Sequence, residues 1–332
     1  MFNLIKFIKN LFSKKKEIEP TNWRDSLIPS PVDFRDVNMK DLLGAVSRET
    51  MPTPNEYNIP YVLTIKNQGQ TPYCVGFTCA TIKEFLERKE GNFIEFDGGW
   101  IYKKAKQIDG MPNVQGTYFR AGLKVLKDFG AKPLNGNESD AQKFKIGGYI
   151  QVDCDFQSLK RAIYEFGAIL MGFIGSNQGW QTAFIRPIKR GESRWGHATT
   201  GIKYNVKFID GQNSWGEQWG DKGLFHFLES YLPFEAWAVV VDMPNDLLPD
   251  ESTKPKYFFA NNLSRGLSDE EITILQNCLK FLGCFPKTQK TTLYFGDITF
   301  DAVKLFQQRY GISPASGFVG ILTRAKLNEI FS

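Results

Sequence analysis

Two polar residues near position 70 have the types and spacing of a nucleophilic site. Cys74 opens an apolar helical run, and Gln68 precedes it by six positions within "NQGQTPYCVGF". A helix dipole favours the thiolate of a cysteine at a helix start, and a neighbouring imidazolium lowers the pKa of the thiol further. We therefore interpret Cys74 as a nucleophile for acyl transfer. The Gln68 amide and the Cys74 backbone N–H are the expected donors to the developing oxyanion.

The general base must come from a short list, because the chain has only two histidines. His226 alternates within "GLFHFLE" and is interpreted as a packing or surface residue, whereas His197 opens the strand-like "HATTGIKY", where it can project into a cleft. Sixteen residues later, "NSWGEQWGDKG" places Asn213 beside Trp215 and Trp219. An amide shielded by tryptophans indicates a hydrogen bond that holds a histidine in one tautomer and orientation.

Together these pieces resemble the papain/cathepsin-like cysteine peptidases. The family pattern is present as Gln68-Gly69, Cys74, Gly196-His197-Ala198, Asn213-Ser214-Trp215-Gly216, Trp219-Gly220 and Gly223. The family's His and Asn lie roughly 130 to 150 residues beyond the Cys, and here they lie 123 and 139 residues beyond it. "PVDFRD" at 31–36 is similar to the start of the mature family domain, so the resemblance covers residues 31–243. It implies an α+β fold with a helical lobe, a β-rich lobe and a cleft between them.

The resemblance gives each residue of the site a role. Cys74 attacks the scissile carbonyl as a thiolate, and His197 completes the ion pair and later protonates the leaving amine. Asn213 orients His197, Trp215 covers that hydrogen bond, and Gln68 stabilises the oxyanion. No metal or organic cofactor is implied, and no grouping of cysteine with histidine has zinc-ligand spacing.

The resemblance also predicts where substrate lies. Gly116, Tyr118 and Phe119 in "VQGTYFRAG" are similar to the family's glycine-rich cleft wall, and Trp215 borders the same cleft. Ala198 and the Met171–Gly172 region line the main specificity pocket, which is therefore apolar. We expect a preference for a bulky apolar residue next to the cleaved residue.

Several positions depart from the family pattern. Thr71 stands where a second cysteine usually precedes the nucleophile, so that disulfide cannot form, and Pro72-Tyr73 and Val75 replace the usual neighbours of the nucleophile. About 30 residues precede "PVDFRD", fewer than in the family's inhibitory pro-segment. We therefore expect no control by a large pro-domain. Residues 37–65 are longer than the usual connection and form either a lid or a blocking loop.

A second domain follows a linker. Residues 244–262 are rich in Pro, Asp and Lys, and residues 263–332 contain three amphipathic segments at 270–282, 299–310 and 322–331. Ser268 with Glu271 has the pattern of a capping box. The segment is similar to the peptidoglycan-binding domain of bacterial and phage wall enzymes through Leu275-Gln276, Leu279, Leu282-Gly283, Phe295-Gly296, Thr299, Ala302-Val303, Phe306-Gln307, Gly311, Gly317, Val319-Gly320, Thr323 and Leu327. Most of these are core or turn positions, which determine the fold better than the ligand.

Composition limits the other possibilities. A chain of 332 residues favours about two domains. The net charge of +5 is spread without a basic block, which argues against a nucleic-acid partner, and five cysteines are too few for a disulfide framework. Cys79 and Cys154 are interpreted as core or incidental residues.

The first 30 residues begin with "MFNLIKFIKNLFSKKK", a basic amphipathic helical pattern. Its charges interrupt the apolar positions, so it does not have the pattern of a secretory signal, and no apolar run reaches the roughly 18 residues of a membrane span. Such a helix can contact a membrane surface, or it can pack on its own protein. Both readings stay open.

Elsewhere we expect irregular structure at 23–61, helices at 74–91, 118–130 and 159–166, and short strands beyond Gly167. The leading hypothesis is a monomeric thiol endopeptidase at the bacterial cell wall, acting on a wall-associated protein or on wall stem peptides. The alternative is a papain-like adaptor without activity that binds peptidoglycan or protein. Unrelated wall-lysing cysteine amidases are a third possibility, but they require neither Gln68 nor the Asn-Ser-Trp-Gly string.

Overall fold

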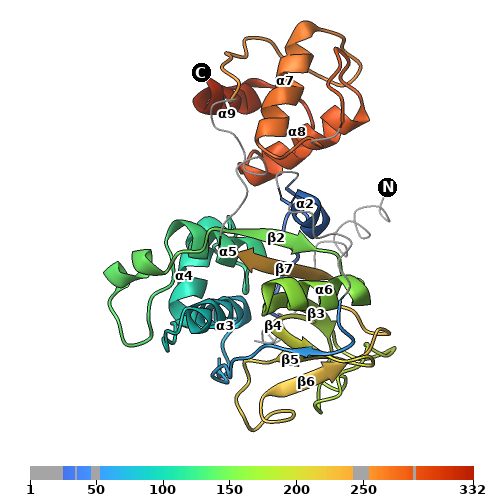
Figure 1. Cartoon of the computed structure of the whole chain (residues 1–332). Coiled ribbons are helices and arrows are strands. Elements are labelled where there is room, and N and C mark those ends of the chain that lie inside the picture. The colour runs from blue at the N-terminus through green and yellow to red at the C-terminus, as the bar shows by residue number, and fades with distance from the viewer. Residues whose placement is uncertain (1–24, 34–35, 46–52, 242–253, 287–288) are drawn as a thin grey trace, which may run out of the picture.

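The computed structural model describes residues 25–33, 36–45, 53–241, 254–286 and 289–332 (Figure 1). The predicted N-terminal amphipathic helix and residues 244–253 of the predicted linker lie outside these ranges. Two hydrophobic cores are built on a central sheet, and a third belongs to the C-terminal helices. The α+β fold class predicted from the sequence is confirmed.

The sheet has seven antiparallel strands. Six follow the order β2-β7-β3-β4-β5-β6, and β1 pairs with β4. Their bounds are β1 Tyr57–Asn58, β2 Gly148–Val152, β3 Ile169–Gly175, β4 Trp195–Tyr204, β5 Ile209–Gln212, β6 Leu224–Phe227 and β7 Glu235–Val240. The runs "ILMGFIG" of β3 and "EAWAVV" of β7 are almost wholly buried, because helices cover both faces at the centre of the sheet.

The helices divide between the two faces. On one face α3 (Cys74–Lys89), α4 (Gly98–Ile108) and α5 (Phe119–Asp128) share a core with Leu170 and Trp237. On the other, α6 (Phe156–Phe166) and α2 (Met39–Ala45) share a core with Ile169 and Met171. Successive strand residues thus face different cores. Cys74 is the first residue of α3, the helix that packs directly on β4.

Three elements of this unit differ from the sequence-based expectation. Residues 39–45, expected to be irregular, form α2, whose Leu42 and Leu43 pack into the core. Helix α4 begins with two glycines, which have low helix propensity, but the Asp97 side chain accepts a hydrogen bond from Trp100 N at 2.9 Å and starts the helix. Residues 138–144 form a 3₁₀ helix, η1 (Glu138–Phe144), which has no apolar periodicity to reveal it.

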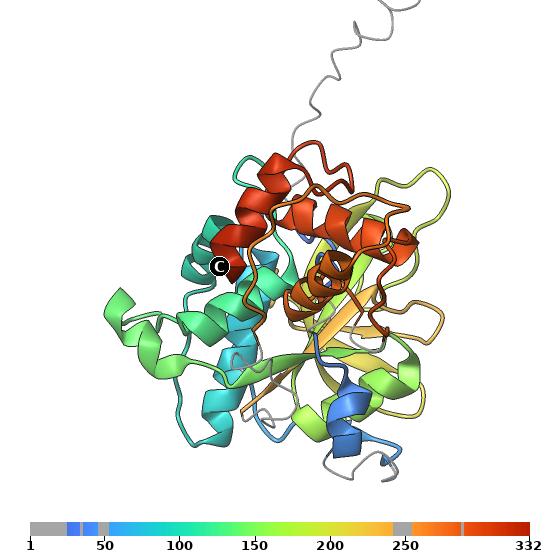
Figure 2. The ribbon, with the colours of Figure 1, turned by 90° about the horizontal axis from the view of Figure 1, so that it is seen from above.

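The C-terminal module has three helices, α7 (Glu270–Phe281), α8 (Asp297–Arg309) and α9 (Ile321–Phe331), close to the predicted segments. Figure 2, turned by 90° from Figure 1, shows these helices lying over the sheet-containing unit. The N-cap of α7 is Asp269, which accepts a hydrogen bond from Glu271 N at 2.8 Å. The capping box expected from Ser268 is therefore wrong by one residue.

Two buried glutamines hold the module together in the same way. Gln276 Nε2 donates to Thr299 Oγ1 at 2.9 Å, and Gln307 Nε2 donates to Thr323 Oγ1 at 2.9 Å. Each glutamine thus joins one helix to the first turn of the next. Phe259, in the segment interpreted as linker, is fully buried in this core, so the module begins before Leu263.

Within the described ranges, no helix combines the length and apolarity needed to cross a membrane.

Candidate active site

Cys74 is the first residue of α3 and is completely buried. Its Sγ lies 3.0 Å from the hydroxyl oxygen of Ser26. The backbone N–H groups of Ala198, Val75 and Cys74 itself lie near enough to the sulfur to lower the pKa of the thiol. Because Ala198 directly follows His197 on β4, the strand that carries the histidine reaches the cysteine at the helix start.

His197 lies on β4 with an amide as its partner. Its Nε2 is 2.8 Å from Asn213 Oδ1, and Ser214 N donates to the same oxygen at 2.8 Å. An amide oxygen only accepts hydrogen bonds, so Nε2 carries the hydrogen and Nδ1 is the nitrogen that gains and loses a proton. Asn213 therefore fixes one tautomer of His197.

Three tryptophans enclose the histidine. The ring of Trp215 is 4.7 Å from the ring of His197, centre to centre, and the rings of Trp180 and Trp195 are 5.7 and 6.0 Å away. The imidazole and the Asn213 amide are both buried. The hydrogen bond between them is thus shielded from water, which strengthens its hold on the ring.

Gln68 is fixed by the chain on both sides of it. Its Oε1 accepts from Ser214 Oγ at 2.6 Å, and its Nε2 donates to the backbone oxygen of Thr71 at 2.7 Å. Gln68 N also donates to Ser214 O at 2.8 Å. The amide nitrogen carries two hydrogens. One is donated to Thr71 O, and the other is available for a hydrogen bond to an oxyanion.

The cleft beside Cys74 is occupied by the chain's own residues 25–28. Ser26 N and Leu27 N donate to Gly196 O at 3.0 and 2.9 Å, and Gly196 N donates to Asp25 Oδ1 at 3.0 Å. On the other side, Ile28 N donates to Thr117 O at 3.0 Å, and Thr117 N donates to Ser26 O at 3.1 Å. The segment thus lies in extended form between the start of β4 and the loop before α5, with an isolated β-bridge between Leu27 and Thr117.

The side chain of Leu27 fills an apolar pocket. A Cβ on Gly172 would lie 2.6 Å from Leu27 Cδ2 and close to Phe119 and Phe234, so the pocket exists because Gly172 has no side chain. Gly116, at φ +82°, is equally confined, since a Cβ there would lie 2.3 Å from Ser26 O. Gly172, Phe119 and Gly116 therefore meet the bound segment where the sequence placed substrate.

Two other expected cleft residues are placed differently. Tyr118 is the N-cap of α5 and points its hydroxyl at Asp109 O, 3.4 Å away. Met171 belongs to the core on the far face of the sheet, so only Gly172 of that pair meets Leu27. The reason is the alternation of side chains along β3. Ala198 packs in the same core as Leu27.

The closed cleft disfavours the thiolate. Burial raises the pKa of the Cys74 thiol to about 11, although the Ser26 hydroxyl and the backbone N–H groups lower it. Burial therefore works against the activated thiolate expected at the helix start. The segment offers the sulfur a hydroxyl, which has no carbonyl carbon to attack. In the described structure the Cys74 sulfur is therefore not placed to attack a carbonyl.

Sequence reasoning missed four residues of the site. Ser26 and Leu27 lie in "DSLIPS", which has no periodicity or motif. The sequence instead indicates residues 37–65 as a lid or blocking loop. In that stretch α2 packs in the core with α6, and residues 57–59 pair along β4, where Ile59 N donates to Ile202 O at 3.2 Å. Trp180 and Trp195 could have been found as tryptophans near the ends of the two strands that form the site.

The other free cysteines do not join the site. Cys79 packs against Gly122 of α5, and burial raises the pKa of its thiol. Cys154 is half-buried, and burial raises the pKa of its thiol to about 12. In the described parts of the chain no three histidine, cysteine or acidic side chains are grouped as a metal site.

Lys106 of α4 organises the cleft wall. Its Nζ donates to Asp109 Oδ2 at 2.7 Å and to the backbone oxygens of Met111, Val114 and Gly116 at 2.7, 2.9 and 3.0 Å. One ammonium group thus fixes the loop that ends at Gly116. The next residue, Thr117, pairs through its backbone with the cleft segment.

We expect Lys106→Met to raise KM about tenfold for a leucine-containing peptide, with kcat changed less than about threefold, because a loose wall binds the substrate backbone poorly. Both constants are measured in chains opened by Leu27→Asp, since the resident segment uses the same wall. Lys104→Met is the matched control, because Lys104 lies on the same helix but pairs with Glu138. Equal KM values in the two variants would contradict this role.

Each of the two structural units matches a known protein family. Residues 97–232 match the family described as "Papain family cysteine protease", and residues 268–327 match "Putative peptidoglycan binding domain". The first match includes His197 and Asn213 and begins after Cys74. The chain contains a papain-family cysteine peptidase domain. A peptidoglycan-binding domain follows it, as the sequence motifs predicted.

Individual relatives of the peptidase domain are distant. The "Uncharacterized peptidase C1-like protein L477" of Acanthamoeba polyphaga mimivirus is 23% identical over 239 residues, which are 58% of this chain and 77% of that protein. Among solved structures, xylellain, a cysteine protease from Xylella fastidiosa, covers 68% of this chain and 99% of its own with a TM-score of 0.60 and 20% identity. Procathepsin B S9 from Trypanosoma congolense covers 73% and 99% with a TM-score of 0.53 and 10% identity. These structures share the fold of the peptidase domain.

Proposed function

We propose that the protein is a thiol endopeptidase that uses Cys74, His197, Asn213 and Gln68. The observation that supports this best is the strand β4. It carries His197, held by Asn213 Oδ1 at 2.8 Å, and the N–H of its next residue, Ala198, lies beside the Cys74 sulfur and lowers the pKa of the thiol. A nucleophile, a base and an orienting group in this order are the arrangement that thiol acyl transfer needs.

The reaction runs in two halves. The Cys74 thiolate attacks the peptide carbonyl carbon, and the oxyanion is met by the Gln68 amide and the Cys74 N–H. His197 gives its proton to the leaving amine, the C–N bond breaks, and a thioester remains on Sγ. His197 then takes a proton from water, which attacks the thioester and releases the carboxylate product. Asn213 keeps Nε2 protonated throughout, so Nδ1 carries each transfer.

The substrate is a peptide or protein with an apolar residue in the Leu27 pocket. Gly172, Phe119 and Phe234 leave room there for a branched aliphatic side chain but supply no charged partner. The C-terminal module would bring the peptidase domain to peptidoglycan and raise the local concentration of substrates in the bacterial cell wall. Those substrates are wall-associated proteins or stem peptides.

Paired assays test this proposal. The full chain carrying Leu27→Asp, which opens the cleft, is incubated with a denatured protein and with purified peptidoglycan, and new amino termini are counted with and without Cys74→Ala. Co-sedimentation with insoluble peptidoglycan measures targeting separately. We expect cleavage that is lost in Cys74→Ala, with sedimentation unchanged. Equal cleavage by both chains would contradict the catalytic role of Cys74, and absence of sedimentation would contradict the targeting role.

A non-catalytic adaptor is the second candidate, and the occupation of the cleft by residues 25–28 favours it. An adaptor would keep residues 25–28 in place permanently. It would show no cleavage with either substrate even after the cleft is opened by substitution at Leu27, whereas a peptidase would gain activity.

A further inference from the structure

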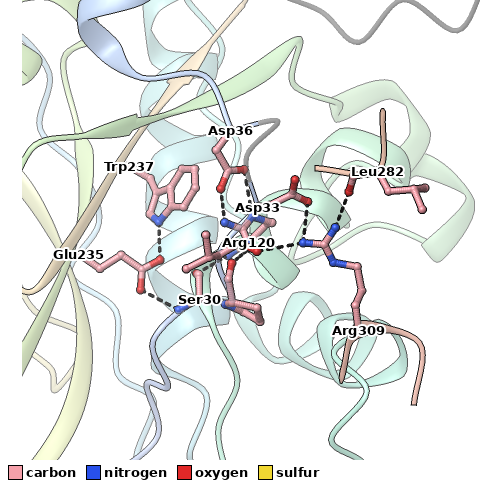
Figure 3. A network of polar contacts seen from close by, with 10 residues as sticks. Ser30, Asp33, Asp36, Arg120, Glu235, Trp237, Leu282 and Arg309 are labelled. Atoms are coloured by element: carbon pink, nitrogen blue, oxygen red, sulfur yellow. Dashed lines mark hydrogen bonds and ion pairs between the residues drawn. The ribbon is translucent and has the colours of Figure 1, made fainter. Parts of the chain in front are cut away.

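The cleft segment continues into a strap that is fastened outside the cleft. We define the strap as residues 25–33. After the cleft, Ser30 N donates to Glu235 Oε2 at 3.0 Å, and Arg120 of α5 donates to Pro31 O. Figure 3 shows these contacts beside Asp36, whose carboxylate also accepts from Arg120. The peptidase domain therefore holds the strap at both the cleft and its outer edge.

The C-terminal module also contacts the strap. Arg309, the last residue of α8, donates through one terminal nitrogen to Val32 O at 2.9 Å and lies 3.3 Å from Asp33 Oδ2. Its other terminal nitrogen donates to Leu282 O within the module (Figure 3). One planar guanidinium thus joins the module to the strap.

The ion pair between Arg309 and Asp33 is largely buried. The Asp33 side chain is 7% exposed and that of Arg309 is 19% exposed, so both charges are largely removed from water. Exposed ion pairs contribute little to stability, but breaking a buried pair leaves an uncompensated charge and is costly. The position of the strap is therefore coupled energetically to the position of the module.

We propose that the C-terminal module latches the strap over Cys74 through Arg309 and Asp33, so that the module controls access to the active site as well as location. The inference rests on the proposed peptidase function. Coupling between two sites is reciprocal, so a ligand that binds the unlatched module better than the latched one opens the cleft.

The rate at which a thiol-directed epoxide modifies Cys74 tests the latch, followed by mass spectrometry of the full-length chain. Asp33→Asn removes the carboxylate charge of the strap and leaves the sequence of the module unchanged. Arg309→Gln removes the guanidinium charge of the module and leaves the strap unchanged. We expect each to raise the labelling rate about tenfold, and the double variant to match the single ones, because both break one contact.

Two references make the result decisive. Arg324→Gln is the matched control, since Arg324 binds Asn262 Oδ1 and Ala260 O within the module and should label at the wild-type rate. Leu27→Asp is the open reference. Wild-type rates for Asp33→Asn and Arg309→Gln beside a fast Leu27→Asp would overturn the latch and leave the peptidase proposal intact. Slow labelling in all chains, Leu27→Asp included, would overturn both.

Discussion

Leu27→Asp is expected to raise the rate of Cys74 labelling about 100-fold, with a matching gain in peptide cleavage. The pocket formed by Gly172, Phe119 and Phe234 is apolar, and a carboxylate placed there has no partner. Expelling it avoids a cost of several kcal/mol, of which about 2.7 kcal/mol corresponds to 100-fold in the open population. Epoxide labelling of the full chain, followed by intact mass, measures the effect.

Val62→Asp is the matched control for this change. It makes a similar apolar-to-acidic change at a side chain that is 88% exposed, outside the cleft segment. We expect it to label as the wild type does. A Leu27→Asp chain that labels no faster than Val62→Asp would mean that residues 25–28 do not limit access to the thiol.

His197→Ala is expected to lower kcat/KM of the opened chain by about 10²- to 10⁴-fold. The variant loses the group that both stabilises the thiolate and protonates the leaving amine, and general acid–base catalysis contributes effects of this size. KM should change less than kcat, because His197 lies beneath the Trp215 ring and acts on the reacting bond rather than on substrate side chains. Initial rates over a range of peptide concentrations separate the two constants.

The second histidine supplies the control. His226 lies on β6, 2.6 Å from Asp210 Oδ1, and also contacts the Phe184 ring. It is part of the β-sheet unit but not of the candidate site, so His226→Ala should keep activity within about threefold of the parent chain. Equal losses in the two variants would indicate that His197 acts through stability alone.

The sequence motifs name the candidate residues but do not indicate what covers the site. Gln68, Cys74, His197 and Asn213 are separated by long intervals but lie in motifs whose spacing reflects one shared geometry, and the structure brings His197 to Asn213 and Gln68 to Ser214. Burial beside Ser26 raises the pKa of the Cys74 thiol and thus works against the thiolate expected from the helix start.

The strap and its latch had no local signal. Residues 25–28 pair with Gly196 and Thr117, and Arg309 reaches Val32 across 277 residues of sequence. The first contacts depend on the tertiary fold of the peptidase unit and the last on how the two domains meet, and periodicity and turn chemistry encode neither. Helix α4 was missed for a related reason, since its glycine start relies on one capping contact from Asp97.

The pH dependence of Cys74 alkylation by iodoacetamide, in Leu27→Asp with and without His197→Ala, tests the central claim most directly. Opening the cleft removes the burial that raises the pKa of the thiol to about 11. With His197 present, the imidazolium should then keep the sulfur ionised and reactive down to about pH 5. Without His197, the reactivity should decrease as the pH is lowered through about 8.5, the ordinary pKa of a free cysteine. Identical profiles with a midpoint near pH 8.5 in both chains would contradict a thiolate–imidazolium pair and hence the proposed peptidase.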